Sequence, residues 1–244
     1  MRLAVVGGTG LVGSKVVARA RQAGDETVVI ARSTGVDLMT GDGLDAALAG
    51  CDAVVDVSNK MTIRARPAVQ YFSRGAANLV AAAERAGIGH LVTLSIVGID
   101  AIDFGYYLGK RAQEKRVRAG AVPWTVVRAT QFFEFPEPLL ASKSPIVAVP
   151  RMLCQPVGAD DVAEFLFRTS HNDPARGTVE IAGPRQEKMV DMARRIVAAR
   201  HLRRLVVPVT MPGKAGKAMA TGGLIPQGDY HRTTTSFDDY LAAL

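Results

Sequence analysis

Short apolar runs alternate with segments of helical periodicity over the first half of the chain. The runs have the length and β-branched content of strands, and they occupy residues 2–6, 27–32, 53–58, 90–95 and 124–130. Between them apolar residues recur every three to four positions, which predicts amphipathic helices at about 11–23, 43–50, 67–86 and 104–119. Strands without polar alternation are buried on both faces. The order therefore predicts a Rossmann-type α/β fold, a doubly wound parallel sheet covered by helices.

The pattern becomes less regular after Phe132. Prolines stand at positions 136, 138, 145, 150 and 156. They are followed by short predicted strands at 145–149, 178–183 and 204–209 and by predicted helices at about 159–170 and 187–200. The stretch 210–229 is rich in Gly, Pro and Met, which predicts loops. We therefore expect a dinucleotide-binding core at 1–131 and a smaller α/β cap at 132–244 that is integrated with it and completes the ligand pocket.

A glycine-rich sequence joins the first strand to the first helix. Residues 5–13 read VVGGTGLVG, which satisfies G-x-G-x-x-G. Glycines there permit a tight turn and a close approach of the backbone to a diphosphate, which then meets the N–H groups at the helix start. The strand–turn–helix context makes this motif specific for a dinucleotide. The predicted cofactor-binding residues of the loop are Gly7, Gly8, Thr9, Gly10, Leu11, Val12 and Gly13.

The end of the second strand predicts which dinucleotide binds. NAD-binding proteins carry an acidic residue there that holds the adenosine ribose, whereas this chain has Arg32 followed by Ser33. A guanidinium suits a 2′-phosphate, which favours NADP over NAD. The alternative is an exposed arginine without a ligand.

A tyrosine and a lysine share one face of the fourth predicted helix. Tyr106 and Lys110 are four residues apart, and Ser95 ends the preceding strand. An ammonium near a phenol would lower the phenol pKa and suit it to proton transfer, while the Ser95 hydroxyl could bind a substrate carbonyl. Tyr107 is an alternative to Tyr106, but it is only three residues from Lys110. The spacing also occurs by chance on ordinary helix surfaces.

Together these segments resemble the atypical short-chain dehydrogenase/reductases, in particular the NmrA-like NAD(P)H-binding group. The resemblance covers essentially the whole chain, and the similar stretches are VVGGTGLVG, LVTLSIVGID, YYLGKRAQEKRVRAG, PWTVVRATQFFEF and QPVGADDVA. The resemblance implies a Rossmann core with Ser95, Tyr106 and Lys110 as the catalytic set, and it gives Lys110 a second role on the nicotinamide ribose. Members of this group often lose the tyrosine set and act as regulators. Its presence here favours an enzyme.

Further candidates follow other strand ends. Asn59 comes after the third strand, where it could line the cofactor crevice. Gln131, Phe132 and Phe133 come after the fifth strand, where they could form an apolar substrate wall or pack the core of the cap. The four histidines are scattered without metal-ligand spacing, so no metal site is expected.

Composition narrows the partners. The formal charge is +7, but the basic stretches are not interleaved with aromatics, which argues against nucleic acid and is compatible with an anionic cofactor. No apolar run approaches the roughly 20 residues of a membrane span. Cys51 and Cys154 lack metal or disulfide spacing, which favours buried free thiols and a cytoplasmic location. The expected partner is a small-molecule substrate; monomer and homodimer both stay open.

Three functions fit these residues. The first is NAD(P)H-dependent reduction of a small, largely apolar carbonyl or quinone, with hydride from NADPH and a proton from Tyr106. The second is a non-catalytic NAD(P)-sensing regulator. The third is a nucleotide-sugar epimerase or dehydratase, which is disfavoured because the roughly 110 residues after Thr130 are few for a second nucleotide site.

Overall fold

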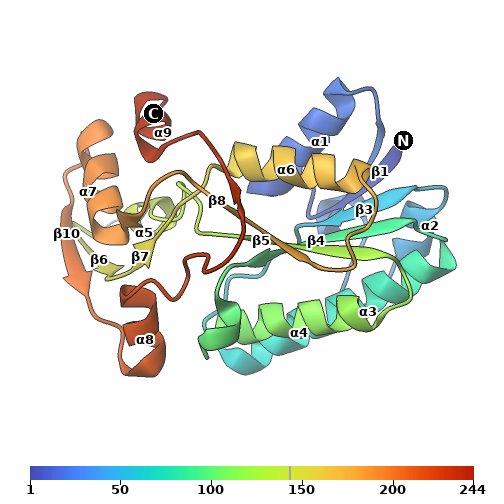
Figure 1. Ribbon diagram of the computed structural model, residues 1–244, viewed down its shortest axis with the longest axis horizontal. Helices are drawn as coiled ribbons and strands as arrows, with labels where there is room; N and C mark the ends of the chain where they lie inside the picture. The colour runs from blue at the N-terminus through green and yellow to red at the C-terminus, as the bar shows by residue number, and fades with distance from the viewer. Residues whose placement is uncertain (143) are drawn as a thin grey trace. The chain divides into compact units, whose positions relative to one another are not determined.

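The apolar runs of the first half lie side by side in one sheet. The computed structural model describes residues 1–142 and 144–244. In the sheet β1 pairs in parallel with β2 on one side and with β3 on the other, and β3 pairs in parallel with β4 (Figure 1). This confirms the predicted Rossmann-type class. In spatial order the seven strands are β11 (His231–Arg232), β8 (Thr178–Ala182), β5 (Trp124–Ala129), β4 (His90–Ile96), β3 (Ala53–Asp56), β1 (Arg2–Val6) and β2 (Glu26–Ile30).

Helices cover both faces of this sheet. Figure 1 shows α3 and α4 along one face and α1 and α6 along the other. An ion pair between Arg19 of α1 and Glu164 of α6, 3.3 Å long, joins the second pair. The helices are α1 (Leu11–Gln22), α2 (Leu44–Leu48), α3 (Ala65–Arg85), α4 (Gly105–Ala119) and α6 (Ala159–His171).

An aliphatic core lies between the sheet and helices α3 and α4. Val54 and Leu91 from the strands pack with Leu79 of α3 and Val117 of α4, and each is almost fully buried. These are the apolar positions of the helical and strand patterns, so burial of apolar area explains why both element types form here.

The chain divides into two compact units. The first contains residues 1–95, 104–128 and 162–179, and the second contains 96–103, 129–161 and 180–244. The predicted boundary at residue 131 is a single point in the chain. In the structure most of α6 and the start of β8, which lie beyond that point, belong to the first unit because α6 covers a face of its sheet.

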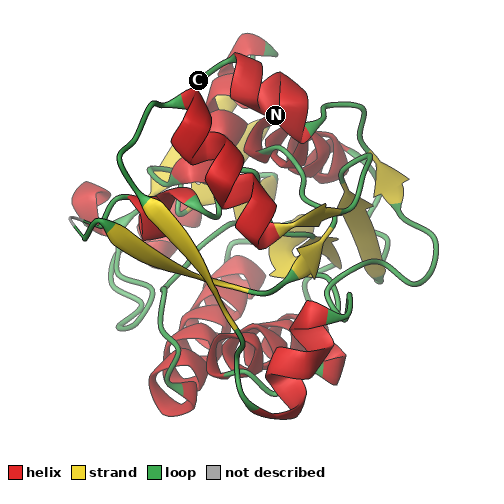
Figure 2. Cartoon of the chain, turned by 90° about the vertical axis from the view of Figure 1, so that its left-hand side faces the viewer, coloured by secondary structure: helices red, strands yellow, loops and turns green. Residues whose placement is uncertain are grey.

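The second unit consists of short elements joined by long loops (Figure 2). β6 and β10 pair in parallel, and β7 and β9 pair antiparallel. Its elements include α5 (Glu137–Leu140), β6 (Ile146–Pro150), β7 (Leu153–Cys154), β9 (Glu187–Lys188), α7 (Met189–Ala199), β10 (Leu205–Val209), α8 (Gly213–Ala220) and α9 (Phe237–Ala242).

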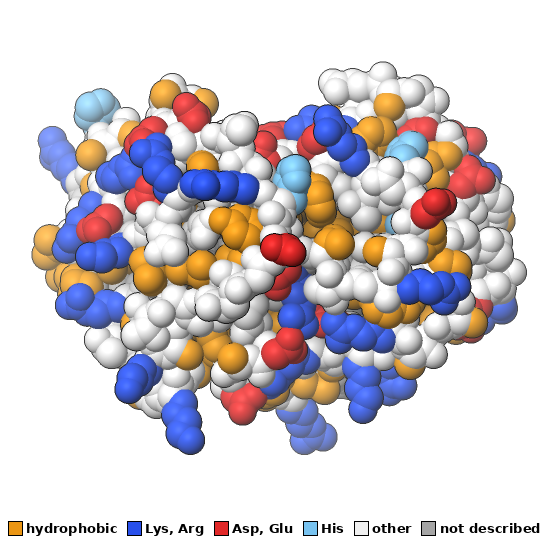
Figure 3. All heavy atoms as spheres, in the orientation of Figure 1, with side chains coloured by type: hydrophobic (Ala, Val, Ile, Leu, Met, Phe, Trp, Pro, Cys, Tyr) orange, Lys and Arg blue, Asp and Glu red, His pale blue; other side chains and the backbone are white. Residues whose placement is uncertain are grey.

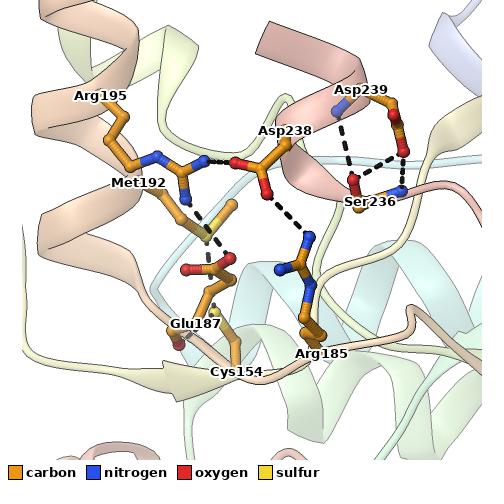
Figure 4. A network of polar contacts seen from close by, with 8 residues as sticks. All are labelled: Cys154, Arg185, Glu187, Met192, Arg195, Ser236, Asp238 and Asp239. Carbon is orange, nitrogen blue, oxygen red and sulfur yellow. Dashed lines mark hydrogen bonds and ion pairs between the residues drawn. The ribbon is translucent and has the colours of Figure 1, made fainter.

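Polar contacts tie the last helix to α7 (Figure 4). Asp238 of α9 forms ion pairs with Arg185 and Arg195, and Arg195 also reaches Glu187 at 3.4 Å. Ser236 accepts a hydrogen bond from the backbone N–H of Asp239, which caps α9. These contacts hold the C-terminal segment to its own unit.

Two local predictions need correction. The stretch 210–229 was expected to contain only loops, but α8 forms within it, because alanines and lysines between the glycines favour a helix. The second strand was expected to reach residue 32, but it ends at Ile30, and a 3₁₀ turn, η1 (Arg32–Thr34), follows.

The two cysteines are buried, and charged side chains of both signs share the surface. Cys51 and Cys154 are buried free thiols, and burial raises the pKa of Cys154 to about 12. On the face drawn in Figure 3, lysine and arginine side chains are scattered among acidic and apolar ones. Within the described residues, no helix combines the length and apolarity that crossing a membrane requires, and no cluster of His, Cys, Asp or Glu could hold a metal ion.

Candidate cofactor site

The glycine loop forms a tight turn between β1 and α1. Gly7 has a φ of +78°, and a Cβ there would lie 3.0 Å from the carbonyl oxygen of Val57. A Cβ at Gly13 would lie only 2.2 Å from the carbonyl oxygen of Gly7. These two positions therefore require glycine for the turn itself. Gly10 is different, because its Cβ would meet only the Gly7 carbonyl, at 3.3 Å.

The N-terminus of α1 is open to an anion. Gly10 is the N-cap residue, offers no side-chain hydrogen bond, and is followed by no acidic residue in the first turn. Thr9, Gly10 and Leu11 are exposed, whereas Val12 and Gly13 are buried. An uncapped twelve-residue helix with free space at its start fits the diphosphate of a dinucleotide, through its N–H groups and the positive end of its dipole.

The segment after β2 presents Arg32 and Ser33 to solvent. The Thr34 hydroxyl fixes the turn, since it accepts a hydrogen bond from the Ala31 N–H at 3.0 Å and donates to a backbone carbonyl of the turn. Arg32 is exposed, and no carboxylate pairs with it in the part of the chain that the structure describes. Its guanidinium can therefore bind an added phosphate without first breaking an ion pair.

Tyr106 is bonded to Asn59 and not to Lys110. Its hydroxyl donates to Asn59 Oδ1 at 2.7 Å. Burial raises the pKa of Tyr106 to about 12, although the bond to Asn59 opposes this shift. This direction is opposite to that expected from the spacing. The reason is burial, which disfavours the charged phenolate. The Phe72 ring packs against both side chains, with its centroid 5.7 Å from that of Tyr106 and 4.9 Å from Lys110 Nζ.

Lys110 is buried beneath α4, at the carboxyl end of the sheet. Its ammonium donates to the carbonyl oxygen of Leu94 at 2.7 Å and to Gln113 Oε1 at 2.5 Å. Burial lowers the pKa of Lys110 to about 8, and the nearby carboxylates of Asp56 and Glu114 oppose the shift. A lysine has three N–H donors. Two are used by the protein, which leaves one for a ligand oxygen.

Ser95 lies near the end of β4 with its hydroxyl in the interior. The residue is 2% exposed, and its Oγ has no hydrogen-bond partner among the described residues. The same holds for Thr93, two positions earlier on the same face of the strand. Unpaired buried hydroxyls are unfavourable unless a water or a ligand satisfies them.

A family model described as NAD(P)H-binding matches residues 7–173, which include the glycine loop, Arg32, Asn59, Ser95, Tyr106 and Lys110. The chain belongs to this NAD(P)H-binding family. The NAD(P)H-binding family that the resemblance implied is thereby confirmed, and solved structures of NAD- and NADP(H)-bound proteins share the fold.

Two curated proteins and one solved structure show how far the similarity extends. A (4-alkanoyl-5-oxo-2,5-dihydrofuran-3-yl)methyl phosphate reductase of Streptomyces griseus is 34% identical over 142 residues, which are 52% of this chain and 47% of that protein. The Photosystem II assembly factor Ycf39 of Synechocystis is 26% identical over 211 residues, 76% of this chain and 63% of the other. The triphenylmethane reductase of Citrobacter, solved with NADP(H), superposes with a TM-score of 0.73 at 14% identity and covers 100% of this chain and 99% of its own. The chain thus spans about half of the first relative and under two thirds of the second.

Sequence reasoning missed several buried polar residues of this NAD(P)H-binding chain. Asp56 at the end of β3 and Gln113 and Glu114 on α4 are each 1% exposed, and Arg128 of β5 is 8% exposed. Glu114 accepts two hydrogen bonds from Arg128, at 2.9 and 2.7 Å. One signal was available: Asp56 interrupts an apolar strand, and a charge at a strand position that must be buried needs a partner.

The three predicted substrate residues lie in the second unit. Gln131 is 6% exposed, and both polar atoms of its amide lack a partner among the described residues. Phe132 is half-buried and forms a β-bridge with Val157. Phe133 is 1% exposed and packs against the rings of Phe237 and Tyr240, so it belongs to the core of this unit.

Proposed function

We propose that this protein is an NADPH-dependent oxidoreductase that reduces a small, largely apolar carbonyl or quinone. The observation that carries the proposal is the arrangement of the first unit. An uncapped helix N-terminus follows β1, Asn59 follows β3, Ser95 lies on β4, and Tyr106 and Lys110 lie on α4. The carboxyl ends of parallel strands share one edge of the sheet, where dinucleotides bind. The Streptomyces relative, named a reductase, supports the reaction class.

Arg32 supports NADPH over NADH. Its exposed guanidinium stands where an acidic residue would reject a 2′-phosphate, and charge-assisted hydrogen bonds to a phosphate are among the stronger polar contacts. Solved structures of similar fold hold NADP(H) or NAD, so this part of the proposal rests on Arg32 itself.

Tyr106 fits the role of proton donor. Because its pKa is raised to about 12, the phenol stays protonated at neutral pH. A protonated phenol can donate to an oxygen that gains negative charge, which is the direction of carbonyl reduction. The bound cofactor supplies the hydride. To donate its one proton, the Tyr106 hydroxyl must turn from Asn59 Oδ1 to the substrate oxygen. The Ser95 hydroxyl, which has no partner among the described residues, can bind the same substrate oxygen.

Gln131 fits a polar contact to the substrate. Its buried amide has both an unpaired donor and an unpaired acceptor. A ligand that pairs with both removes an unfavourable desolvation, which favours substrates that carry a carbonyl or hydroxyl beside their apolar part.

A screen for turnover tests the proposal. The protein is incubated with NADPH and a panel of quinones, aldehydes and ketones, and NADPH oxidation is followed by absorbance. We expect turnover with at least one apolar member and slower turnover with NADH. Tight NADPH binding without turnover on any member would contradict the catalytic part alone.

The second candidate is a non-catalytic NAD(P)-sensing protein. Two observations favour it. The Tyr106 hydroxyl is bonded to Asn59, whereas the partners of the Lys110 ammonium are Leu94 and Gln113. In addition, one relative is named an assembly factor. It predicts NADPH binding that alters a partner interaction, with no oxidation of the cofactor in the same screen.

A further inference from the structure

A chain of buried hydrogen bonds runs from Lys110 to the end of β3. Lys110 donates to Gln113 Oε1 at 2.5 Å, and Gln113 Nε2 donates to Asp56 Oδ2 at 2.7 Å. The other carboxylate oxygen of Asp56 accepts the backbone N–H of Ser58 at 2.9 Å. Lys110, Gln113 and Asp56 are 4%, 1% and 1% exposed, so water does not replace these bonds.

The donor and the acceptor of each of these hydrogen bonds are fixed by chemistry. Gln113 must present its oxygen to the ammonium, which donates only, and its nitrogen to the carboxylate, which accepts only. Its amide orientation is therefore determined. Leu94 holds the ammonium from the β4 side at 2.7 Å, so two fixed acceptors set the position of Nζ.

These hydrogen bonds also connect the Lys110 ammonium to a carboxylate of opposite charge. A buried ammonium is unfavourable unless it is paired. The Phe72 ring faces Lys110 from α3 and is not titratable. On α4, Glu114 is paired with Arg128 and Arg118, and the Tyr106 phenol is bonded to Asn59. The Asp56 carboxylate on β3 is thus the acid that Lys110 reaches through Gln113.

From this arrangement we propose that Gln113 and Asp56 are positioning residues of the nucleotide site: Gln113 orients the Lys110 ammonium, and Asp56 keeps it charged so that its third N–H can bind a ribose oxygen of the cofactor. The role rests on the proposed function, because Lys110 is the group expected to touch the cofactor. Neither Gln113 nor Asp56 touches it directly. Both act through Lys110.

Two variants separate charge from geometry. Asp56→Asn keeps the size and an acceptor oxygen but removes the charge. Gln113→Met keeps the length but removes both hydrogen bonds. Gln155→Met is the matched control, because Gln155 is another buried glutamine with two hydrogen bonds, to Gly183 and Tyr230 in the second unit.

Lysine side-chain NMR on the free protein gives the first readout. With 13C-labelled lysine and the Lys110 signal assigned by its loss in Lys110→Met, we expect the titration midpoint in Asp56→Asn to fall by at least about half a pH unit. Gln113→Met should shift it in the same direction, and Gln155→Met should leave it unchanged.

NADPH affinity against pH gives the second readout. Affinity of the wild type should fall as the pH rises through the Lys110 titration, since the ammonium loses its charge. In Asp56→Asn the fall should start at lower pH, so binding at pH 6 stays within about twofold while binding at pH 9, above both midpoints, weakens about threefold. A merely structural effect would weaken binding equally at every pH.

The outcomes are distinct. Unchanged Lys110 titration in both variants, with intact NADPH binding, overturns this inference alone. If the Lys110 titration shifts but the pH profile of NADPH binding does not, the hydrogen bonds through Gln113 and Asp56 do not serve the nucleotide site. That result also overturns this inference. No NADPH binding by the wild type overturns the proposed function.

Discussion

At the scale of single residues, the environment of Tyr106 differs most from what its spacing suggests. The phenol is half-buried, bonded to Asn59, and packed against Phe72, whose ring also lies against the Lys110 ammonium. Proton donation by this phenol requires only that it stay protonated and reach the substrate oxygen, and the raised pKa satisfies the first condition.

Tyr106→Phe should lower turnover about 100-fold or more and leave NADPH affinity within a few-fold, because it removes the proton donor and keeps the ring. Steady-state kinetics with a substrate from the screen measures both quantities. Tyr107→Phe is the control: Tyr107 is buried against Phe104, and its hydroxyl has no proposed role. A fully active Tyr106→Phe would remove this phenol from the reaction.

Arg32→Ala should remove the preference for NADPH. Loss of one charge-assisted contact to the 2′-phosphate corresponds to about tenfold or more in NADPH affinity, with little change for NADH. Fluorescence titration of both cofactors measures the ratio. Arg203→Ala removes another exposed arginine, in the second unit, and should change neither value. Equal affinity of the wild type for both cofactors would contradict the assignment.

At the scale of elements, the start of α1 and the inner face of α4 carry the most specific structure. Gly10→Val should abolish NADPH binding, because the side chain would fill the space before the helix where the diphosphate is expected. The fold should stay intact, because among the described residues the added Cβ meets only the Gly7 carbonyl oxygen, at 3.3 Å. Binding and circular dichroism are measured together. Gly228→Val, a site with open space around it, is the control. NADPH binding that survives in Gly10→Val would place the diphosphate elsewhere.

The ion pair beneath α4 should govern the stability of the first unit. Glu114→Gln removes a carboxylate that accepts two hydrogen bonds from the buried Arg128 guanidinium, and breaking such a pair costs about 3–5 kcal/mol in free energy of unfolding. The double variant Glu114→Leu with Arg128→Met removes both charges and should recover most of that loss. Urea unfolding compares the single and double variants. A double variant no more stable than Glu114→Gln would show that packing, not charge, dominates here.

At the scale of the whole molecule, the first unit is built from separated stretches of chain. The segment 162–179 returns to it after the chain has entered the second unit. Its α6 pairs with α1 through Glu164 and Arg19, and the Gly177 carbonyl accepts the Val126 N–H at 3.0 Å.

A fragment ending at residue 131 should therefore fail to fold cooperatively, since it lacks α6, one of the two helices on that face of the sheet, and leaves apolar strand residues in water. Thermal melting followed by circular dichroism and by NADPH binding tests this against the full chain. A sharp melting transition in the fragment would show that residues 1–131 form an independent domain.

The sequence alone was sufficient for the local features. The strands of the first half, the helices between them and the glycine loop depend on residues adjacent in the chain, because periodicity and backbone freedom are local properties. The positions of α1, α3 and α4 and the cofactor class followed from these patterns. In the second unit the pattern was weaker. The helix α8 was not predicted, because glycines and prolines are typical of loops. Phe133, considered as a possible substrate contact or a core residue, is buried in the core.

Only the tertiary structure decided the chemistry around Lys110. Gln113 and Asp56 are 57 positions apart, and Tyr106 and Asn59 are 47 apart, so no spacing rule joins them. The four-residue spacing of Tyr106 and Lys110 placed both on one helix, but Phe72 of α3 packs against both side chains, and burial then sets both pKa values. Local sequence determines which groups are available, and packing between distant segments determines which of them meet.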